Sequence, residues 1–404
     1  MEKRKNTQPK IRFPEFNDSW NHVQLSELLK ESKKRNDDLK YDKDGVLSVS
    51  GDVGIVNQIE HLGRSYAGVS VHNYHVVETG DIVYTKSPLK ENPFGIIKLN
   101  KGNPGIVSTL YAVYNVRTEN AIGEFIDHYF SLDENTNRYL RPLVKKGAKN
   151  DMKINNGYVL HDKIFAPSIP EQTRITEFLN VINQKISYLK QRRDLLEKYK
   201  RGVLEKLLRQ ELRFKDENGK QFSDWEEKKL RDVAEFRNGK AHEQDISETG
   251  RYIVVNSKFI SQEGEVKKYS DTQICPLFKN EVVMVMSDVP NGKALAKCFY
   301  IEADDTYTLN QRICALKATS IEPKLLYYLI NRNRYYLLFD SGVGQTNLTK
   351  DEVLNCPLLV PRDKREQNKI VNFINAIDER IEAVKGEVKA IEKYKKGLLQ
   401  NMFC

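Results

Sequence analysis

The 404-residue sequence predicts an α+β fold in which two lobes alternate with two long helices. Two observations lead to this prediction: an internal repeat with a helical pattern of apolar residues, and short strand-like runs on either side of each copy. We expect the two helices to pair as an antiparallel coiled coil, with the two halves of the chain related by a pseudo-two-fold axis.

The repeat lies at residues 171–208 and 366–403, which align without a gap. Identical pairs include Glu171/Glu366, Gln172/Gln367, Ile175/Ile370, Phe178/Phe373, Asn180/Asn375, Lys190/Lys385, Tyr199/Tyr394 and Gly202/Gly397. The segments that lead into the two copies also match, with Val159-Leu160 and Pro167 corresponding to Val353-Leu354 and Pro361.

The two halves also begin alike, because Arg12-Phe13 and Trp20 correspond to Arg213-Phe214 and Trp225. The chain therefore divides into a first lobe at 1–168, a central helix at 169–210, a second lobe at 211–362 and a C-terminal helix at 363–404.

Apolar residues recur in both copies at steps of three and four, which is typical of a coiled-coil seam. We predict that the first helix packs against the second through Ile182, Ile186, Leu189 and Leu196 on one side and Ile377, Ile381, Val384 and Ile391 on the other. The alternative is that each helix is buried separately in its own lobe; the narrow apolar stripe and the charged remaining faces favour pairing. About 38 residues span roughly 57 Å, so such a pair would act as a spacer.

Between the helices the pattern changes to short strand-like runs bounded by Gly, Asn and Asp, for example at 82–84, 111–114, 252–255 and 282–286. Helical stretches are expected near 121–133 and 322–335. Each lobe is therefore predicted to be α+β.

The formal net charge of +9 and the 30% charged residues make a polyanionic partner plausible. The five cysteines show no CxxC spacing, so we expect reduced buried thiols and no metal site. His72 and His75 are interpreted as ordinary polar residues. No apolar run approaches the ~20 residues of a membrane span, and no signal peptide is recognisable, so we expect a cytoplasmic protein.

The first alternative class of protein is an enzyme. Gly239-Lys240 and Gly292-Lys293 lack the preceding glycine of a phosphate-binding loop, and Asn92-Pro93-Phe94 lacks the second proline of an amino-methyltransferase element. The sequence therefore predicts a non-catalytic chain without a cofactor of its own. The second alternative, a coiled-coil adaptor that binds no nucleic acid, does not explain two dissimilar lobes on two copies of one repeated helix.

Several motifs resemble one known family. They are Pro170-Glu171-Gln172 with Glu197-Lys198-Tyr199-Lys200-Arg201-Gly202, and Glu366-Gln367 with Glu392-Lys393-Tyr394-Lys395-Lys396-Gly397. With the alternation of lobes and helices, they resemble the specificity subunits of Type I restriction-modification systems over essentially the whole chain. The opening Arg12-Phe13-Pro14-Glu15-Phe16 is similar to Gram-positive, staphylococcal-type members. Arg362-Asp363-Lys364-Arg365 departs from the Pro-rich segment that is usual before Glu-Gln.

The resemblance implies that each lobe recognises one half of a bipartite, asymmetric site in double-stranded DNA, while the helix pair sets the unread spacer. It also implies that two modification subunits dock on the helices and supply methylation from S-adenosylmethionine. Two restriction subunits would supply ATP- and Mg-dependent translocation and cleavage. The complex would be an adenine-N6 methyltransferase and an endonuclease.

Base recognition needs Arg or Lys for guanine and Asn or Gln for adenine, and phosphate contacts need Lys and Arg. Loops that combine these residues with glycine give the candidate DNA-binding residues: Lys86, Ser87, Lys90, Lys145, Lys146, Lys149 and Asn150 in the first lobe, and Ser287, Asn291, Lys293, Gln311, Arg312, Gln345, Thr346 and Asn347 in the second. Each of these residues could instead lie on an ordinary solvated loop.

Overall fold

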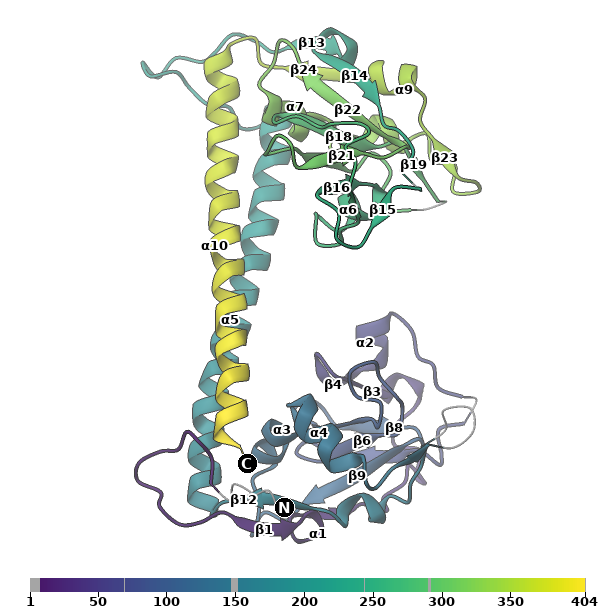
Figure 1. The fold of residues 1–404 in the computed structure, drawn as a ribbon, viewed down its shortest axis with the longest axis vertical. Coiled ribbons are helices and arrows are strands. Elements are labelled where there is room, and N and C mark those ends of the chain that lie inside the picture. Colours follow the sequence, from purple (N-terminus) through teal and green to yellow (C-terminus); the bar gives the residue numbers. More distant parts are fainter. Residues whose placement is uncertain (1–7, 69, 147–151, 243, 290–291, 404) are drawn as a thin grey trace. The chain divides into compact units, whose positions relative to one another are not determined.

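The computed structural model describes residues 8–68, 70–146, 152–242, 244–289 and 292–403 (Figure 1). The chain forms two compact units. Unit 1 comprises Met1–Gln191 and Lys385–Cys404, and unit 2 comprises Arg192–Val384. Each unit holds one lobe together with part of both long helices, so the predicted α+β fold with two long helices is confirmed.

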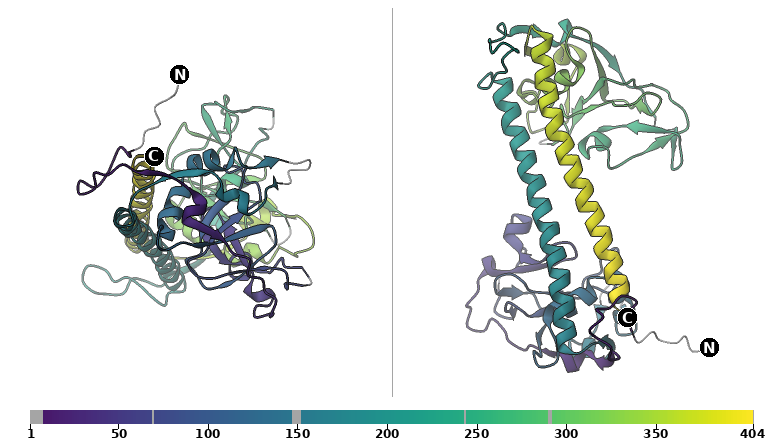
Figure 2. Two further views of the ribbon diagram at one scale, coloured as in Figure 1. Left: turned by 90° about the horizontal axis from the view of Figure 1, so that it is seen from below. Right: turned by 90° about the vertical axis from the view of Figure 1, so that its left-hand side faces the viewer.

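The long helices are α5 (Ile169–Leu208) and α10 (Lys364–Met402), which lie side by side (Figure 2). In unit 1, Lys190 Nζ lies 2.7 Å from Glu392 Oε1. In unit 2, Lys200 Nζ lies 2.5 Å from Asp378 Oδ1. Because the residue number rises along α5 while that of its partner falls along α10, the helices are antiparallel, as predicted.

The predicted seam residues are mostly buried. In unit 1, Ile391 packs against the apolar cluster that contains Ile186. In unit 2, Leu196 packs against the cluster that contains Ile381. Buried seam residues are Ile182, Ile186, Leu189, Ile377, Ile381 and Val384, and the half-buried ones are Leu196 and Ile391. This burial supports the seam, whose residue-by-residue pairing stays a prediction.

The C-terminal end of α10 is part of the core of the first lobe. The Phe403 ring lies 5.4 Å from that of Phe125 and 6.3 Å from that of Trp20, measured between centroids. The backbone N–H of Ile11 donates to the carbonyl of Asn401 at 2.9 Å. The end of α10 is therefore fixed to the first lobe by both apolar and polar contacts.

The first lobe contains many short elements. They are β1 (Asn21–Gln24), α1 (Leu25–Leu28), β2 (Leu29–Glu31), η1 (Lys43–Gly45), β3 (Leu47–Ser50), β4 (Gly54–Asn57), α2 (Gln58–Leu62), β5 (His75–Val77), β6 (Ile82–Thr85), β7 (Ile96–Leu99), β8 (Gly105–Val107), β9 (Tyr111–Val116), α3 (Gly123–Phe130), α4 (Asp133–Leu140), β10 (Lys145–Lys146), β11 (Met152–Lys153), η3 (Gly157–Leu160) and β12 (Lys163–Ala166).

The second lobe is built in the same manner. Its elements are β13 (Glu226–Lys229), η4 (Leu230–Asp232), β14 (Ala234–Asn238), β15 (Ile246–Ser247), β16 (Tyr252–Val255), α6 (Ser257–Ser261), β17 (Tyr269–Ser270), β18 (Glu281–Val285), β19 (Ser287–Asp288), β20 (Cys298–Tyr300), β21 (Tyr307–Leu309), β22 (Ile313–Ala318), α7 (Pro323–Ile330), α8 (Arg334–Leu337), β23 (Thr346–Asn347), α9 (Lys350–Leu354) and β24 (Pro357–Val360).

The central sheets of the two lobes share one topology. Within the described residues, the strand order is β2-β9-β6-β7 in the first lobe and β14-β22-β18-β20 in the second, with antiparallel neighbours throughout. The middle strands β6 and β18 are buried on both faces, which explains their runs of Ile, Val, Tyr and Met. The duplication therefore extends to the lobes, although their sequences have diverged.

In each lobe the first and last strands pair just before the long helix begins. The pairs are β1 with β12 and β13 with β24. Gln172 then donates to the Pro167 carbonyl at 3.0 Å and accepts from the N–H of Ile122 at 2.9 Å. Gln367 makes the same two bonds, to the Pro361 carbonyl at 2.7 Å and from the N-cap residue of α7 at 2.8 Å. The repeated glutamine thus joins helix, loop and lobe in both units.

The four described cysteines, Cys275, Cys298, Cys314 and Cys356, are buried as free thiols. Burial raises the pKa of Cys314 to about 12 and that of Cys356 to about 11, which keeps both protonated. Across the described ranges there is no group of three or more His, Cys, Asp or Glu residues placed to hold a metal ion. Within the same residues, no helix is long and apolar enough to cross a membrane.

Candidate nucleic-acid interface

Several candidate residues of the second lobe meet where β18 ends. Strand β19 pairs with β23, with Ser287 opposite Asn347. The side-chain amide of Gln345 donates to the Ser287 hydroxyl at 2.6 Å. The N–H of Met286 donates to the carbonyl of Arg312 at 3.0 Å. The structure therefore gathers polar candidates from three separate segments at one end of the sheet.

Arg312 has an unusual backbone conformation for a residue with a side chain. Its φ is +66°, in the left-handed region, and its side chain is exposed. Such a conformation costs about 1–3 kcal/mol and persists where the surrounding structure imposes it, often at functional sites. The strained turn leaves the Arg312 side chain exposed, and its backbone carbonyl bonds Met286, the residue before β19.

Lys240 lies beside the same turn, although the sequence analysis did not select it. A Cβ on Gly239 would lie 1.9 Å from the carbonyl oxygen of Asn310, so this position accepts only glycine. The approach places Lys240 in a parallel bridge with Asn310, and its side chain is exposed. Gly239-Lys240 is therefore a close contact between two backbone segments and not a phosphate-binding loop.

Hydrogen bonds from other residues of the lobe hold the segment at 293–295 that follows β19. Asp288 Oδ2 accepts from the N–H groups of Ala294 and Leu295 at 2.7 and 3.0 Å. Arg332 donates to the Lys293 carbonyl at 3.3 Å, which leaves the Lys293 side chain exposed. Asp288 and Arg332 are therefore supporting residues that the sequence pattern did not reveal.

The remaining candidates of the second lobe differ from one another. Gln311 is exposed. Thr346 is buried and its hydroxyl donates to Asp340 at 3.3 Å, which favours a supporting role. Asn291 lies outside the described residues.

In the first lobe, two predicted basic segments lie close together. Residues 86–90 follow β6, and Lys145 lies on β10, which pairs with β11. The Tyr84 hydroxyl donates to the Phe94 carbonyl at 2.8 Å and lies 4.0 Å from Met152 Sδ. Tyr84 therefore contacts both the segment that follows β6 and strand β11.

The candidate residues of the first lobe differ in their exposure to solvent. Lys90 is 95% exposed, and Ser87 and Lys145 are exposed as well. Lys86 is half-buried, and burial lowers its pKa although Glu31 opposes the change. Lys149 and Asn150 lie outside the described residues, as does the side chain of Lys146.

Arg35 adds a further positive charge next to His75. Its Nη1 lies 2.9 Å from Nε2 of His75, which is buried on β5. Burial lowers the pKa of His75 to about 4, with Arg35 and Lys86 contributing in the same direction. The imidazole is therefore neutral at pH 7 and accepts from Arg35.

These arrangements can form hydrogen bonds and charge contacts with a large anionic partner. In the second lobe, Arg312, Gln345 and Asn347 combine the guanidinium and amide groups that recognise base edges. In the first, Lys90, Lys145 and Arg35 suit phosphate contacts. Both surfaces lie on loops held by a rigid sheet, as is usual for binding sites.

The fold is that of the S subunits of Type I restriction-modification systems. A crystal structure of such a subunit from M. genitalium aligns with a TM-score of 0.57 at 14% identity, covering 98% of this chain and 99% of that one. A chain from a structure concerning complex assembly and conformational transition of the type I R-M system aligns with a TM-score of 0.51 at 18% identity, covering 95% and 96% of the two chains.

The sequence comparisons point to the same class. Residues 222–393 match the family described as Type I restriction modification DNA specificity domain. The Type I restriction enzyme MjaVIII specificity subunit of Methanocaldococcus jannaschii is 24% identical over 259 residues. That alignment covers 59% of this chain and 60% of the relative, less than two thirds of its length.

Proposed function

We propose that this chain is the DNA sequence-recognition subunit of a Type I restriction-modification complex, in which each lobe recognises one half of a bipartite, asymmetric site. The observation that carries the proposal is the pair of lobes with one sheet topology, each joined to a copy of the same repeated helix. Two half-site readers on one spacer need this duplicated organisation. The match of residues 222–393 to a DNA specificity domain supports it.

The lobes have diverged in sequence, whereas the helices keep their repeated motifs, and this difference fits separate roles for lobes and helices. Loops that recognise different bases must differ, whereas two docking sites for copies of one partner remain alike. We therefore propose that two modification subunits dock on α5 and α10 and carry the S-adenosylmethionine. Two restriction subunits would bring the ATP- and Mg-dependent activities. The chain itself would act without a cofactor, in the cytoplasm, within a system of staphylococcal type.

The test of this proposal combines binding with methylation mapping. The chain is purified with its modification subunits, and the methylated positions are sequenced in DNA exposed to the complex. We expect one bipartite motif with a fixed spacer, and binding that weakens steeply with salt. A coiled-coil adaptor would show no salt-dependent DNA binding. Methylation without sequence preference would also contradict the proposal.

Exchange of one lobe tests whether the lobes act independently. We replace residues 13–165 by the first lobe of another S subunit and repeat the mapping. One half of the motif should change while the other half stays the same. A change in both halves would show that the lobes are not separate readers.

The isolated chain provides the last comparison. Without its modification subunits it should neither methylate nor cut DNA, and it should not crosslink to S-adenosylmethionine. Crosslinking to the purified chain would show that it carries part of the catalytic site.

A further inference from the structure

The start of the first lobe is joined to the start of α5 by a buried ion pair. Arg12 Nε and Nη2 donate to the two carboxylate oxygens of Glu171, both at 2.7 Å. The indole N–H of Trp20 donates to the same carboxylate at 3.2 Å. Glu171 is 1% exposed. We call Arg12, Trp20 and Glu171 clasp 1.

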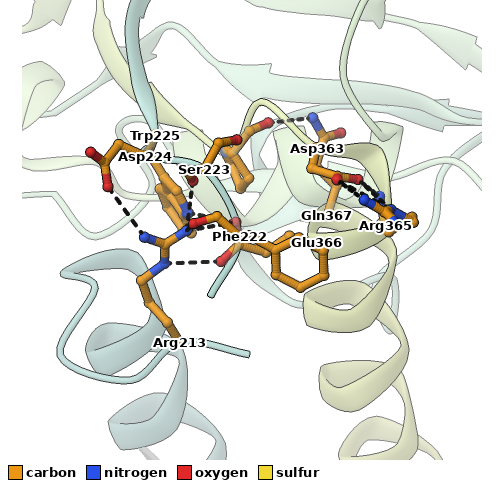
Figure 3. A network of polar contacts seen from close by, with 10 residues as sticks. Arg213, Phe222, Ser223, Asp224, Trp225, Asp363, Arg365, Glu366 and Gln367 are labelled. Atoms are coloured by element: carbon orange, nitrogen blue, oxygen red, sulfur yellow. Dashed lines mark hydrogen bonds and ion pairs between the residues drawn. The ribbon is translucent and has the colours of Figure 1, made fainter. Parts of the chain in front are cut away.

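The second lobe contains the same set of contacts (Figure 3). Arg213 Nε and Nη2 donate to the two carboxylate oxygens of Glu366, both at 3.1 Å. The indole N–H of Trp225 donates to Glu366 at 3.0 Å. Arg213 also donates to the Ser223 carbonyl at 2.8 Å. Glu366 is 0% exposed, and we call Arg213, Trp225 and Glu366 clasp 2.

Each clasp joins three parts of its unit. The arginine lies in the segment before the lobe, the tryptophan directly precedes the first strand, and the glutamate lies in the first turn of the helix that follows the last strand. The glutamate is therefore held where the beginning and the end of the lobe meet the helix. A carboxylate near a helix N-terminus is also stabilised by the helix dipole.

The geometry of a clasp restricts angles as well as distances. A guanidinium that donates two parallel bonds to one carboxylate fixes the relative orientation of the two groups, which a lysine cannot do. A tilt of the lobe would separate the guanidinium from a buried carboxylate, and this is costly because the separated charges would not be solvated. The apolar core of each lobe also stabilises the packing of lobe on helix, but apolar contacts do not fix the angle between them.

We propose that the two clasps are positioning devices that fix the orientation of each lobe on its helix and thereby restrict the length of spacer that the protein accepts between half-sites. This inference rests on the proposed function. The clasp residues do not contact bases; they act through the lobe that they hold. Loosening a clasp should therefore broaden spacer tolerance and leave half-site sequences unchanged.

The experiment uses the complete complex with modification subunits and a series of DNAs. These contain the motif mapped for the wild type, its spacer lengthened or shortened by one or two base pairs, and the same motif with single mismatches in either half-site. The variants are Arg213→Lys, which keeps the charge and loses the paired bonds, and Glu366→Gln, which keeps an acceptor for Trp225. Methylation rates on altered spacers are divided by the rate on the native spacer.

We expect this ratio to rise by roughly fivefold or more in both variants, because catalysis falls steeply when the target base is misplaced and a flexible lobe tolerates more positions. Mismatch discrimination should stay at the wild-type level. The matched control is Arg365→Gln, which removes the exposed ion pair with Asp363 at the start of the same helix. It should leave the ratio unchanged.

A uniform loss of methylation at all spacers, or an unchanged ratio in stably folded variants, would overturn the proposal. If Glu366→Gln does not fold, the double variant Arg213→Met with Glu366→Met removes both charges and keeps apolar volume. Glu171→Gln applies the same test to clasp 1. Absence of any sequence-dependent methylation by the wild-type complex would instead contradict the proposed function.

Discussion

Lys200 on α5 donates to Asp378 on α10 at 2.5 Å, and the repeat keeps the lysine of this ion pair but not its aspartate. The internal repeat places Lys395 opposite Asn183 there. Lys395 is half-buried, and burial together with Lys101 lowers its pKa. The helices therefore share a half-buried lysine but differ at the position that the repeat places opposite it, which is Asp378 in one copy and Asn183 in the other.

Asn183→Asp should stabilise the protein by about 0.5–1 kcal/mol, because it supplies the carboxylate that the repeat predicts for a partly buried pair. The free energy of unfolding is measured in urea at pH 7 and low salt. Asp378→Asn should lower stability by a similar amount. A less stable Asn183→Asp variant would show that Lys395 does not face position 183.

The pH dependence of stability should reflect His128, whose ring lies 3.2 Å from the Asn180 side chain. Burial lowers the pKa of His128 to about 4, with Lys101 and Lys395 acting in the same direction and Asp127 opposing them. Below an unfolded pKa of about 6.5 the unfolded chain takes up a proton and the folded chain does not. Stability should therefore fall between pH 6.5 and 4, by at most about 3 kcal/mol from this residue.

The variant His128→Gln should reduce this loss of stability while keeping a polar partner for Asn180. Unfolding is measured between pH 4 and 7, with the exposed His61→Gln as the matched control. An unchanged pH profile for His128→Gln would show that another group causes the acid sensitivity.

The proposed DNA-binding residues of the second lobe can be tested one by one. Arg312→Ala, Gln345→Ala and Asn347→Ala should each weaken binding to the second half-site by about 1–3 kcal/mol where the side chain bonds a base edge. Arg312→Gly separates contact from strain, because glycine accepts the φ of +66°. It should lose the same affinity as Arg312→Ala and be more stable.

Lys145→Ala should behave differently, since a phosphate contact carries no sequence information. It should weaken binding to all DNA alike and flatten the dependence on salt. Fluorescence anisotropy at several salt concentrations distinguishes the two kinds of residue. Wild-type affinity for all these variants would mean that both surfaces are misplaced.

Gly239→Ala should destabilise the second lobe and displace Lys240, because its Cβ would lie 1.9 Å from the Asn310 carbonyl oxygen. A loss of about 1–3 kcal/mol is typical of such a backbone clash. Gly344→Ala is the control, since nothing lies within 4 Å of its Cβ. Equal stability of the two variants, measured by thermal unfolding, would refute the close approach.

The sequence predicted the parts of this fold that are repeated. The Glu171-Gln172 and Glu366-Gln367 pairs locate the two helices because each pair makes the same contacts in its own unit. The shared sheet topology was harder to predict from the sequence, because β6 and β18 have in common only a pattern of buried apolar residues.

Further candidate residues are found only where segments distant in the sequence come into contact. Lys240 becomes a candidate only because residue 239 touches residue 310. Arg35 becomes one because His75, far along the chain, lies 2.9 Å from it. Neither contact leaves a local pattern in the sequence.

The length of the helix pair should determine the spacer between half-sites. Adding four residues after Lys190 would lengthen α5 alone, but α10 is fixed in both units, by Glu366 in clasp 2 and by Phe403 in the core of the first lobe. A matched insertion of four residues after Lys385, the equivalent position of the repeat, is therefore needed. The insertion after Lys190 without its match should destabilise the protein.

The matched insertion adds about 6 Å of helix rise, which is nearly two base-pair steps of about 3.4 Å. Four residues exceed one seam step of about 3.5 residues by only half a residue, so the seam stays nearly in register. Methylation mapping should then show both half-sites unchanged and a spacer longer by one or two base pairs. A matched seven-residue insertion keeps the heptad and adds about 10.5 Å, close to three base pairs. If the four-residue protein folds, binds modification subunits and methylates only the original spacing, the helices do not set the spacer.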